Sequence, residues 1–140
     1  MRFQQYINEI FDSKADIEIM DSSKEYHRYD FLIGNTYYKF IAQDNGYKGE
    51  DFWEIMFATS DGEMEIINTD NALKVFSAVI KCLGIFIKKV KPNTFYFGAK
   101  ETSRRKLYDR FAKMIPRILP YKIKKMDAGL IMKRYEFERK

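Results

Sequence analysis

The feature that most constrains the fold is a change of hydrophobic period near the middle of the chain. From Ala72 to Val90 the apolar residues recur at helical spacing and form one stripe of a long amphipathic helix. Before this segment, short runs alternate between apolar and polar residues, which is the pattern of half-buried strands. A strand-rich first half that leads into a long helix predicts an α+β fold.

The first half is predicted to be an antiparallel meander that follows a short N-terminal helix. Gly34-Asn35 and Asp61-Gly62 are hairpin-turn signals, because each dipeptide lies between two alternating runs. The predicted elements are a helix over 2–12 and strands over 16–20, 29–33, 36–42, 52–59 and 63–67.

The second half is predicted to add a strand, a helix and a closing strand pair. Pro116 is expected to kink or end this helix near Ile115, because proline lacks the backbone N–H that the helix needs. The predicted elements are a strand over 94–97, a helix capped by Thr102 or Ser103, and strands over 121–126 and 130–137. With four or five strands before the long helix, the predicted order is α-β-β-β-β-α-β-α-β-β. We expect a single domain of residues 1–140 with a mixed, mainly antiparallel sheet and helices packed on it.

Cysteine content and hydropathy indicate the compartment. Cys82 is the single cysteine, so no disulfide framework is expected and the cytoplasm is the default location. The N-terminal residues lack the unbroken apolar stretch of a signal peptide. Lysines interrupt the apolar segment 72–90, which argues against a membrane span.

The charge is positive and unevenly distributed. The formal net charge is +5 and the excess of Lys and Arg lies in residues 81–140, whereas residues 44–70 are acidic. A basic half of this kind fits nucleic acid, an anionic cofactor or an acidic protein, and it also fits a solvated surface without a partner.

The order of elements resembles the GNAT acyltransferase superfamily. In that fold an antiparallel meander leads into the cofactor-binding helix, followed by a strand, a helix and a closing strand pair. GNAT proteins often carry Asn-x-x-Ala-x-x-Leu-Tyr-x-x-x-Gly-Phe after the fifth strand. Within residues 102–111, Leu107-Tyr108 fits this pattern, whereas its Asn, Ala and Gly-Phe are absent. The combination of a Val-Phe-containing helix with Ser-Arg-x-x-Leu-Tyr also resembles small bacteriophage proteins of unassigned function.

One segment departs from what the resemblance implies for a cofactor. GNAT proteins hold the pyrophosphate of acetyl-CoA with Arg/Gln-x-x-Gly-x-Gly/Ala before the cofactor helix, where glycines let N–H groups approach the phosphates. The corresponding residues 65–72 contain no glycine and no basic residue, and Asp70 adds a carboxylate. The departure predicts that no cofactor is bound. If acyl-CoA did bind, the contacts would come from Asn68, Thr69 and Asn71.

Tyr108 is the catalytic candidate that the resemblance implies. In an acyltransferase it would be the general acid that reprotonates the leaving thiolate of CoA, since a phenol has a pKa near that of a thiol. The interpretation that we favour is a tyrosine at the border of the buried helix stripe, with its hydroxyl in water.

Basic residues form the candidate anion site. Lys100, Ser103, Arg104 and Arg105 surround a predicted helix start, which fits a bound phosphate or carboxylate and equally fits an ordinary capped helix. A larger basic surface, interleaved with Tyr96, Tyr121 and Tyr135, would bind single strands through phosphate contacts and base stacking, or would be a solvated face. Its cations are Arg104, Arg105, Arg110, Lys113, Arg117, Lys122, Lys124 and Lys125.

Metal and nucleophile chemistry finds little support. His27 is the single histidine and has no cysteine near it in the sequence, so neither a zinc site nor a Cys-His pair is expected. Cys82 lies close to the apolar stripe of the long helix and is interpreted as a core residue.

These observations predict a non-catalytic, GNAT-like phage accessory protein that binds a host or phage macromolecule through its basic C-terminal half in the host cytoplasm. One alternative is an active acetyl-CoA-dependent N-acyltransferase with a divergent phosphate loop. Another is a protein that binds single-stranded nucleic acid or RNA. The expected partner is a protein or a second copy of the chain, with nucleic acid as the alternative and with no membrane and no metal.

Overall fold

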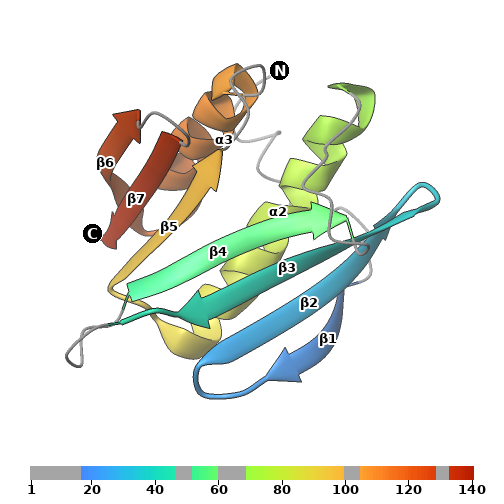
Figure 1. Cartoon of the computed structure of the whole chain (residues 1–140), viewed down its shortest axis with the longest axis horizontal. Coiled ribbons are helices and arrows are strands. Elements are labelled where there is room, and N and C mark those ends of the chain that lie inside the picture. Colours follow the sequence, from blue (N-terminus) through green and yellow to red (C-terminus); the bar gives the residue numbers. More distant parts are fainter. Residues whose placement is uncertain (1–16, 47–51, 60–68, 100–104, 129–132) are drawn as a thin grey trace. The chain divides into compact units, whose positions relative to one another are not determined.

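The computed structural model describes residues 17–46, 52–59, 69–99, 105–128 and 133–140. Seven strands and two helices lie in these ranges (Figure 1). In chain order they are β1 (Ile17–Ser22), β2 (Tyr26–Ile33), β3 (Thr36–Asp44), β4 (Phe52–Thr59), α2 (Thr69–Val90), β5 (Thr94–Ala99), α3 (Arg105–Ile118), β6 (Tyr121–Ala128) and β7 (Lys133–Arg139).

The strands form one mixed sheet in the order β1-β2-β3-β4-β5-β7-β6. The pair β4–β5 is parallel over Phe52–Glu54 and Thr94–Tyr96, whereas β1–β2, β5–β7 and β6–β7 are antiparallel. The predicted α+β class with a mixed, mainly antiparallel sheet is therefore confirmed. The parallel pair follows from the long helix between β4 and β5, which gives the chain room to cross over.

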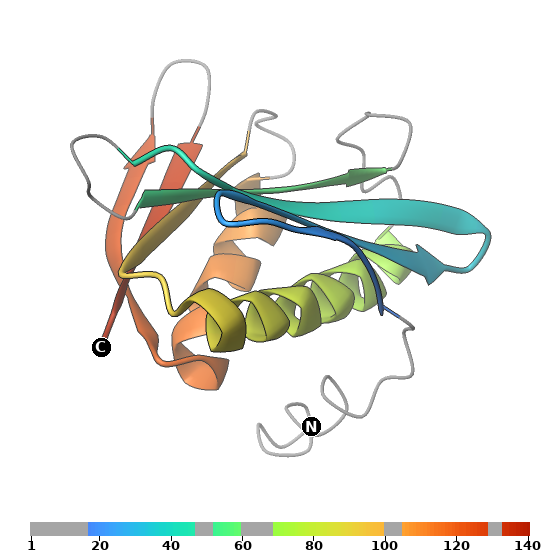
Figure 2. The same cartoon turned by 90° about the horizontal axis from the view of Figure 1, so that it is seen from below.

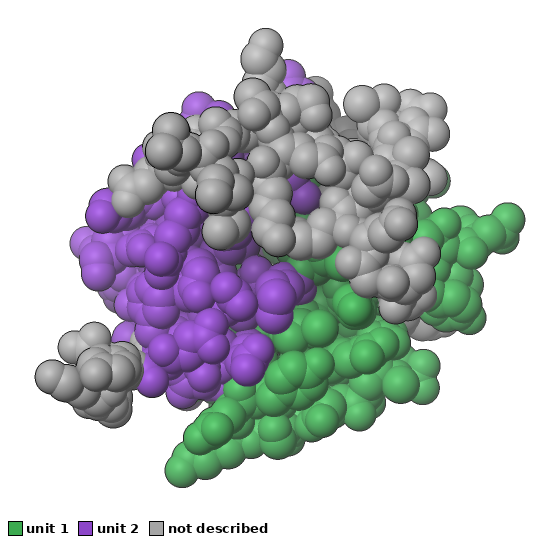
Figure 3. Space-filling view, viewed as in Figure 1, with its two compact units in different colours: residues 1–42, 57–90 green, residues 43–56, 91–140 purple. Residues whose placement is uncertain are grey.

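The chain divides into two compact units, coloured separately in Figure 3. Unit 1 contains residues 1–42 and 57–90, and unit 2 contains residues 43–56 and 91–140. Each unit has its own set of buried side chains. That the chain folds as a single domain stays a prediction.

In unit 1, α2 packs on β2 and β3 (Figure 2). Alternate residues of the two strands are buried and form aromatic stacks across the strands, because side chains of a strand point to opposite faces in turn. Tyr29 stacks on Phe40 and Phe31 stacks on Tyr38, each with 5.6 Å between ring centroids. Phe86 of α2 lies 6.5 Å from Phe40, so the predicted apolar stripe of the helix does face the strands.

Two backbone features fix the ends of elements in unit 1. Gly34 has a φ of 62°, the left-handed conformation that glycine adopts at little cost, which confirms the hairpin turn predicted at Gly34-Asn35. Lys88 and Lys89 lie in the last turn of α2, where the helix dipole favours cations. Lys91 follows with a φ of 52°, and the helix ends before Pro92.

In unit 2, α3 packs on β5 and β7 through an aromatic core. Phe97 of β5 lies at its centre, 5.3 Å from Phe111 and 4.9 Å from Tyr135 between ring centroids. The hydroxyl of Tyr135 also donates a hydrogen bond to Oδ1 of Asp109 on α3 at 2.5 Å. This bond and the aromatic contacts fix which face of α3 meets the strands.

Several predicted element ends were wrong: β2 begins at Tyr26 and not at Tyr29, and the ends of the second helix and of β5 also differ. The second helix does not end near Ile115: it continues to Ile118, and the N–H of Leu119 still donates to the Ile115 carbonyl at 2.9 Å. Pro116 lies in the last turn, where it removes one backbone hydrogen bond and the helix still continues to Ile118. Likewise β5 does not end at Phe97, because Gly98 and Ala99 still pair with β7.

Several predictions fall outside the described residues. They are the helix over 2–12, the strand over 63–67, the turn at Asp61-Gly62 and the cap at Thr102 or Ser103. Neither α2 nor α3 combines the length and the apolar composition that a membrane-crossing helix requires.

Candidate functional site: the outer face of α3

The outer face of α3 carries a row of cations in unit 2. Arg110, Lys113 and Arg117 are all exposed, and their spacing of three and four residues places them on one side of the helix. Lys106 precedes Arg110 by four residues in the same helix. We call Arg110, Lys113 and Arg117 together the cationic face of α3.

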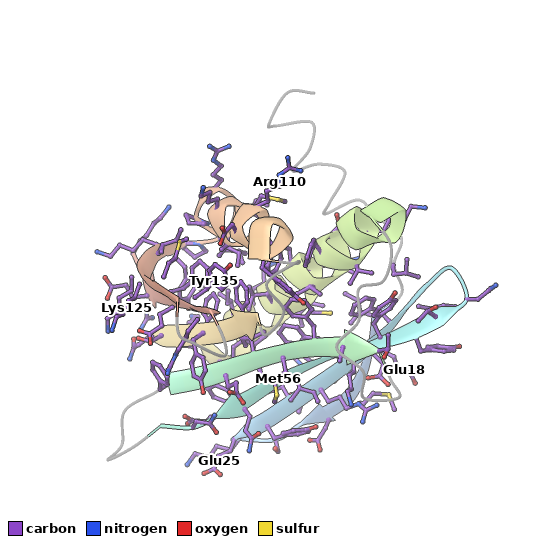
Figure 4. The ribbon with its side chains drawn as sticks, turned by 45° about the horizontal axis from the view of Figure 1, so that its top comes forward. Glu18, Glu25, Met56, Arg110, Lys125 and Tyr135 are labelled. Carbon is purple, nitrogen blue, oxygen red and sulfur yellow. The ribbon has the colours of Figure 1, made fainter. Side chains whose placement is uncertain are left out.

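This face lies opposite the buried side of the same helix. Tyr108, Phe111, Ala112 and Ile115 are buried. At about 100° per residue the centre of that buried side is about half a turn away from the three cations. Figure 4 shows Arg110 on the side of α3 turned away from Tyr135. The packing that holds α3 on the strands therefore also directs the cations toward solvent.

Acidic residues near this face bear on its charge. Asp109 is the one acidic residue of α3, and it accepts the hydrogen bond from Tyr135 on a half-buried flank of the helix. Arg110 and Lys113 make no ion pair with any residue that the structure describes. A helix face with such cations attracts anions, because the like charges raise the local positive potential.

The lysines of β6 belong to a different surface. Tyr135 and Phe137 of β7 face α3 and are buried, so the alternate residues Glu136 and Glu138 point to the other face of the sheet. Lys122 pairs with Glu138 and Lys125 pairs with Glu136 in the antiparallel register of β6 and β7. The lysines therefore project away from α3.

Glu138 of β7 offsets one of these lysines, whereas Glu136 pairs with Arg134 of its own strand, with 3.1 Å between Nε and Oε1. The Nζ of Lys122 lies 3.2 Å from Oε1 of Glu138. Opposite charges facing each other across two strands stabilise the strand pair, and this one offsets the charge of Lys122. Lys124 lies at an irregularity of the register and is exposed.

The structure thus divides the predicted basic surface. Arg110, Lys113 and Arg117 come together on α3, whereas Lys122 and Lys125 lie on the opposite face of the sheet. Of the remaining predicted residues, Lys100, Ser103 and Arg104 lie outside the described part, and of Arg105 only the backbone is described.

The predicted interleaving aromatics are not exposed for base stacking. Tyr121 and Tyr135 are 0% exposed, and their hydroxyls donate to the Pro92 carbonyl and to Asp109. The interpretation of these two tyrosines as stacking residues was wrong, because both rings belong to the core of unit 2.

Tyr96 is half-buried, and neighbouring groups of unit 2 already cover its ring. Phe52 stacks on it with 4.7 Å between centroids, and the guanidinium carbon of Arg134 lies 3.9 Å from the ring centroid. The Tyr96 hydroxyl donates to Glu54 at 3.0 Å and accepts from Asn45 at 3.2 Å. Burial raises the pKa of Tyr96, so its hydroxyl stays a donor at neutral pH. The sequence pattern did not predict this cluster, because only the pairing of β5 with β4 and β7 brings its members together.

Tyr108 is buried, with 4% of its surface exposed, and lies 6.3 Å from Phe97 between ring centroids. A hydroxyl in water was the favoured expectation, and the ring lies deeper than that. A general acid must reach the group that it protonates. A substrate could reach the buried Tyr108 hydroxyl only if the protein changed its conformation, so the burial argues against the catalytic assignment.

The start of α2 holds the acyl-CoA candidates. Thr69 begins the helix and Asn71 lies in its first turn; only their backbone is described, and Asn68 lies outside the described residues. The acidic, glycine-free sequence of residues 65–72 therefore leads directly into this helix start.

The remaining titratable candidates lie in the core of unit 1. His27 is buried, and its Nδ1 shares a hydrogen bond with Oγ of Ser22 at 3.1 Å. The centroid of its ring lies 5.4 Å from that of Phe86. Burial and the nearby Lys89 lower the pKa of His27. Cys82 is buried and burial raises its pKa, so it is the predicted inert core residue. Within the described ranges, no three His, Cys, Asp or Glu side chains are grouped so that they could hold a metal ion.

Comparison of the sequence with models of known protein families and with curated proteins finds no match. The function must therefore be inferred from the geometry and chemistry of the residues themselves.

Proposed function

We propose that this chain is a non-catalytic binding domain with a GNAT-like order of elements, and that it docks on an anionic macromolecule of a phage or its host through the cationic face of α3. The observation that carries the proposal is the set of three exposed cations, Arg110, Lys113 and Arg117, on one outward helix face.

The non-catalytic part of the proposal is supported by the start of α2 and by Tyr108. Residues 65–72, which correspond in sequence order to the GNAT phosphate loop, contain no glycine and no cation, and Asp70 adds a carboxylate to them. A carboxylate about 4 Å from a phosphate charge repels it by roughly 4 kcal/mol at an effective dielectric constant of about 20. Tyr108 is buried among core aromatics. Both observations disfavour an acyl-transfer site.

The binding part is supported by the contrast between α3 and β6. Glu138 of β7 forms an ion pair with Lys122, so this lysine adds little net potential, and Glu136 is paired with Arg134. Arg110 and Lys113 of α3 make no such pair with a described residue. Arg110 and Lys113 are therefore two cations of the C-terminal half whose charge no described carboxylate offsets through an ion pair.

The binding test uses heparin as a generic polyanion. The triple variant Arg110→Gln/Lys113→Gln/Arg117→Gln removes three positive charges from one face while keeping residues that favour helix formation. The matched control Lys24→Gln/Lys74→Gln/Lys88→Gln removes three exposed positive charges from unit 1. We expect the α3 variant to leave a heparin column at clearly lower salt than the control. Equal elution of the two variants would show that net charge, and not the α3 face, causes retention.

The cofactor test is titration calorimetry with acetyl-CoA. We expect no binding at micromolar concentration. Micromolar affinity would refute the non-catalytic assignment and would favour the N-acyltransferase alternative. In that case thiol release with amine substrates, compared between the native protein and Tyr108→Phe, would test the acid role of the tyrosine.

A further inference from the structure

We infer that the anionic partner of α3 is the phosphate backbone of a nucleic-acid duplex, bound without base stacking. This inference rests on the proposed function, because it names the partner of the same cationic face. The expectation from the sequence is a protein partner, with single-stranded nucleic acid as an alternative. A duplex differs from both.

The described part of unit 2 offers no apolar centre for a protein interface. Large hydrophobic side chains that are exposed in the described residues all belong to unit 1, namely Ile19, Met20, Leu32 and Tyr37. A protein interface of useful affinity needs a buried centre, commonly apolar and aromatic, inside its polar rim. Around the cationic face of α3 the described residues of unit 2 supply cations without such a centre. A partner recognised by charge alone fits this surface better than a folded protein does.

Unpaired bases would find no stacking platform beside the cationic face. Single strands are bound by stacking bases on exposed aromatic rings together with phosphate contacts. Tyr121 and Tyr135 are fully buried, and the ring of Tyr96 is already occupied by Phe52 and Arg134. Tyr96 also lies on the far face of the sheet from α3, because its β7 partner Glu136 does. Within the described part of unit 2, only the phosphates of a nucleic acid remain to be contacted.

The shape of the cationic face suits a duplex. Arg110 and Arg117 are seven residues apart, so the row of cations extends about 10 Å along the helix axis. Duplex DNA carries one charge per about 1.7 Å of its axis, a higher linear density than a single strand offers. A row about 10 Å long, laid along the duplex axis, spans roughly six phosphate charges, which outnumber its three cations. The guanidinium of Arg110 can hold a phosphate by two parallel N–H donors.

Salt should weaken such binding steeply, because each phosphate contact releases counterions. Neutralising about three phosphates of a duplex gives a slope of roughly −2.7 in a plot of log affinity against log salt concentration. Affinity should then fall roughly 40-fold between about 50 and 200 mM salt.

The experiment measures fluorescence anisotropy of a short labelled DNA duplex of mixed sequence, titrated with the full chain at several salt concentrations. We expect micromolar binding at low salt, a slope of roughly −2.7, and little change when the sequence of the duplex is changed. The triple α3 variant should lose at least about tenfold in affinity and most of the salt slope, while the control triple variant of unit 1 should keep both. Thermal unfolding of each variant establishes that both remain folded.

Three outcomes overturn the inference. No binding to the duplex while heparin retention still depends on α3 would leave the proposed function in place and remove this partner. Tighter binding of an unpaired strand than of the duplex would show that bases contribute. Competition by polyglutamate as effective as that by unlabelled duplex, at equal charge concentration, would assign the surface to acidic proteins.

Discussion

Three buried tyrosines provide a direct test of the hydrogen-bond description of the two cores. Tyr29, Tyr121 and Tyr135 are each 0% exposed, so Tyr→Phe removes the same oxygen from an equally dry environment. Their hydroxyls differ in partner. Tyr121 donates to the Pro92 carbonyl and Tyr135 donates to the Asp109 carboxylate. The Tyr29 hydroxyl has no hydrogen-bond partner among the described residues.

The magnitudes follow from these partners. A neutral hydrogen bond contributes about 1 kcal/mol net, and one to a charged group about 1.5–3 kcal/mol. We therefore expect Tyr121→Phe to lower the free energy of unfolding by about 1 kcal/mol and Tyr135→Phe by about 1.5–3 kcal/mol. Tyr29→Phe has the opposite sign: burying a polar group without a partner costs about 1–3 kcal/mol, and phenylalanine removes that cost. Burial also raises the pKa of Tyr29, so ionisation offers no relief at neutral pH.

The assay is equilibrium unfolding in urea for the native protein and the three variants. With slopes of about 1–2 kcal/mol/M, a change of about 1 kcal/mol moves the midpoint by about 0.5–1 M, which is readily measured. We expect the midpoint of Tyr29→Phe at or above that of the native protein and the other two below it. If Tyr29→Phe lowered the stability as much as Tyr121→Phe, the Tyr29 hydroxyl would have a hydrogen-bond partner, such as a buried water. The assignment of an unpartnered buried hydroxyl would then be wrong.

Two further predictions concern glycine and histidine in unit 1. Gly34→Ala should lower the free energy of unfolding by about 1–2 kcal/mol, because alanine resists the positive φ of 62°, whereas Gly84→Ala within α2 should raise it by about 0.5–1 kcal/mol. Neither added Cβ would have an atom within 4 Å, so packing does not explain the difference. If the urea assay found that both substitutions change stability in the same direction, this prediction would be wrong. Burial lowers the pKa of His27 below 6.5, so the native state binds fewer protons than the unfolded state, and stability should fall as pH drops below about 6.5, by at most about 1.4 kcal/mol per pH unit. His27→Gln should remove this contribution, so the free energy of unfolding should depend less on pH between about pH 7 and 5. If the pH dependence did not change, His27 would bind protons equally in the native and unfolded states.

Much of the fold is predictable because its signals are local. The alternation of β2 and β3, the glycine turn between them and the helical stripe of α2 all lie within short stretches of sequence. The ends of β5 and α3 are not local in this sense. Gly98 stays in its strand because β7 pairs with it, and α3 passes Pro116 because the proline falls in its final turn.

The site was predictable in part for the same reason. The spacing of Arg110, Lys113 and Arg117 is visible in the sequence, and it places them together once the segment is helical. That Lys122 and Lys125 face the other way depends on which β7 residues they pair with, and the register of two strands is a tertiary property. The burial of Tyr121 and Tyr135 likewise depends on contacts with distant residues. Aromatic content alone does not distinguish a core ring from an exposed one.

The two outermost strands of the sheet, β1 and β6, differ in how well they resist joining a neighbouring molecule. Lys122, Lys124 and Lys125 line β6, and charged side chains on a terminal strand keep a second sheet from adding to it. On β1, by contrast, Ile19 and Met20 are about half exposed. At high concentration, unwanted polymerisation should start from β1, and Ile19→Lys is the change that would improve the solubility of the protein.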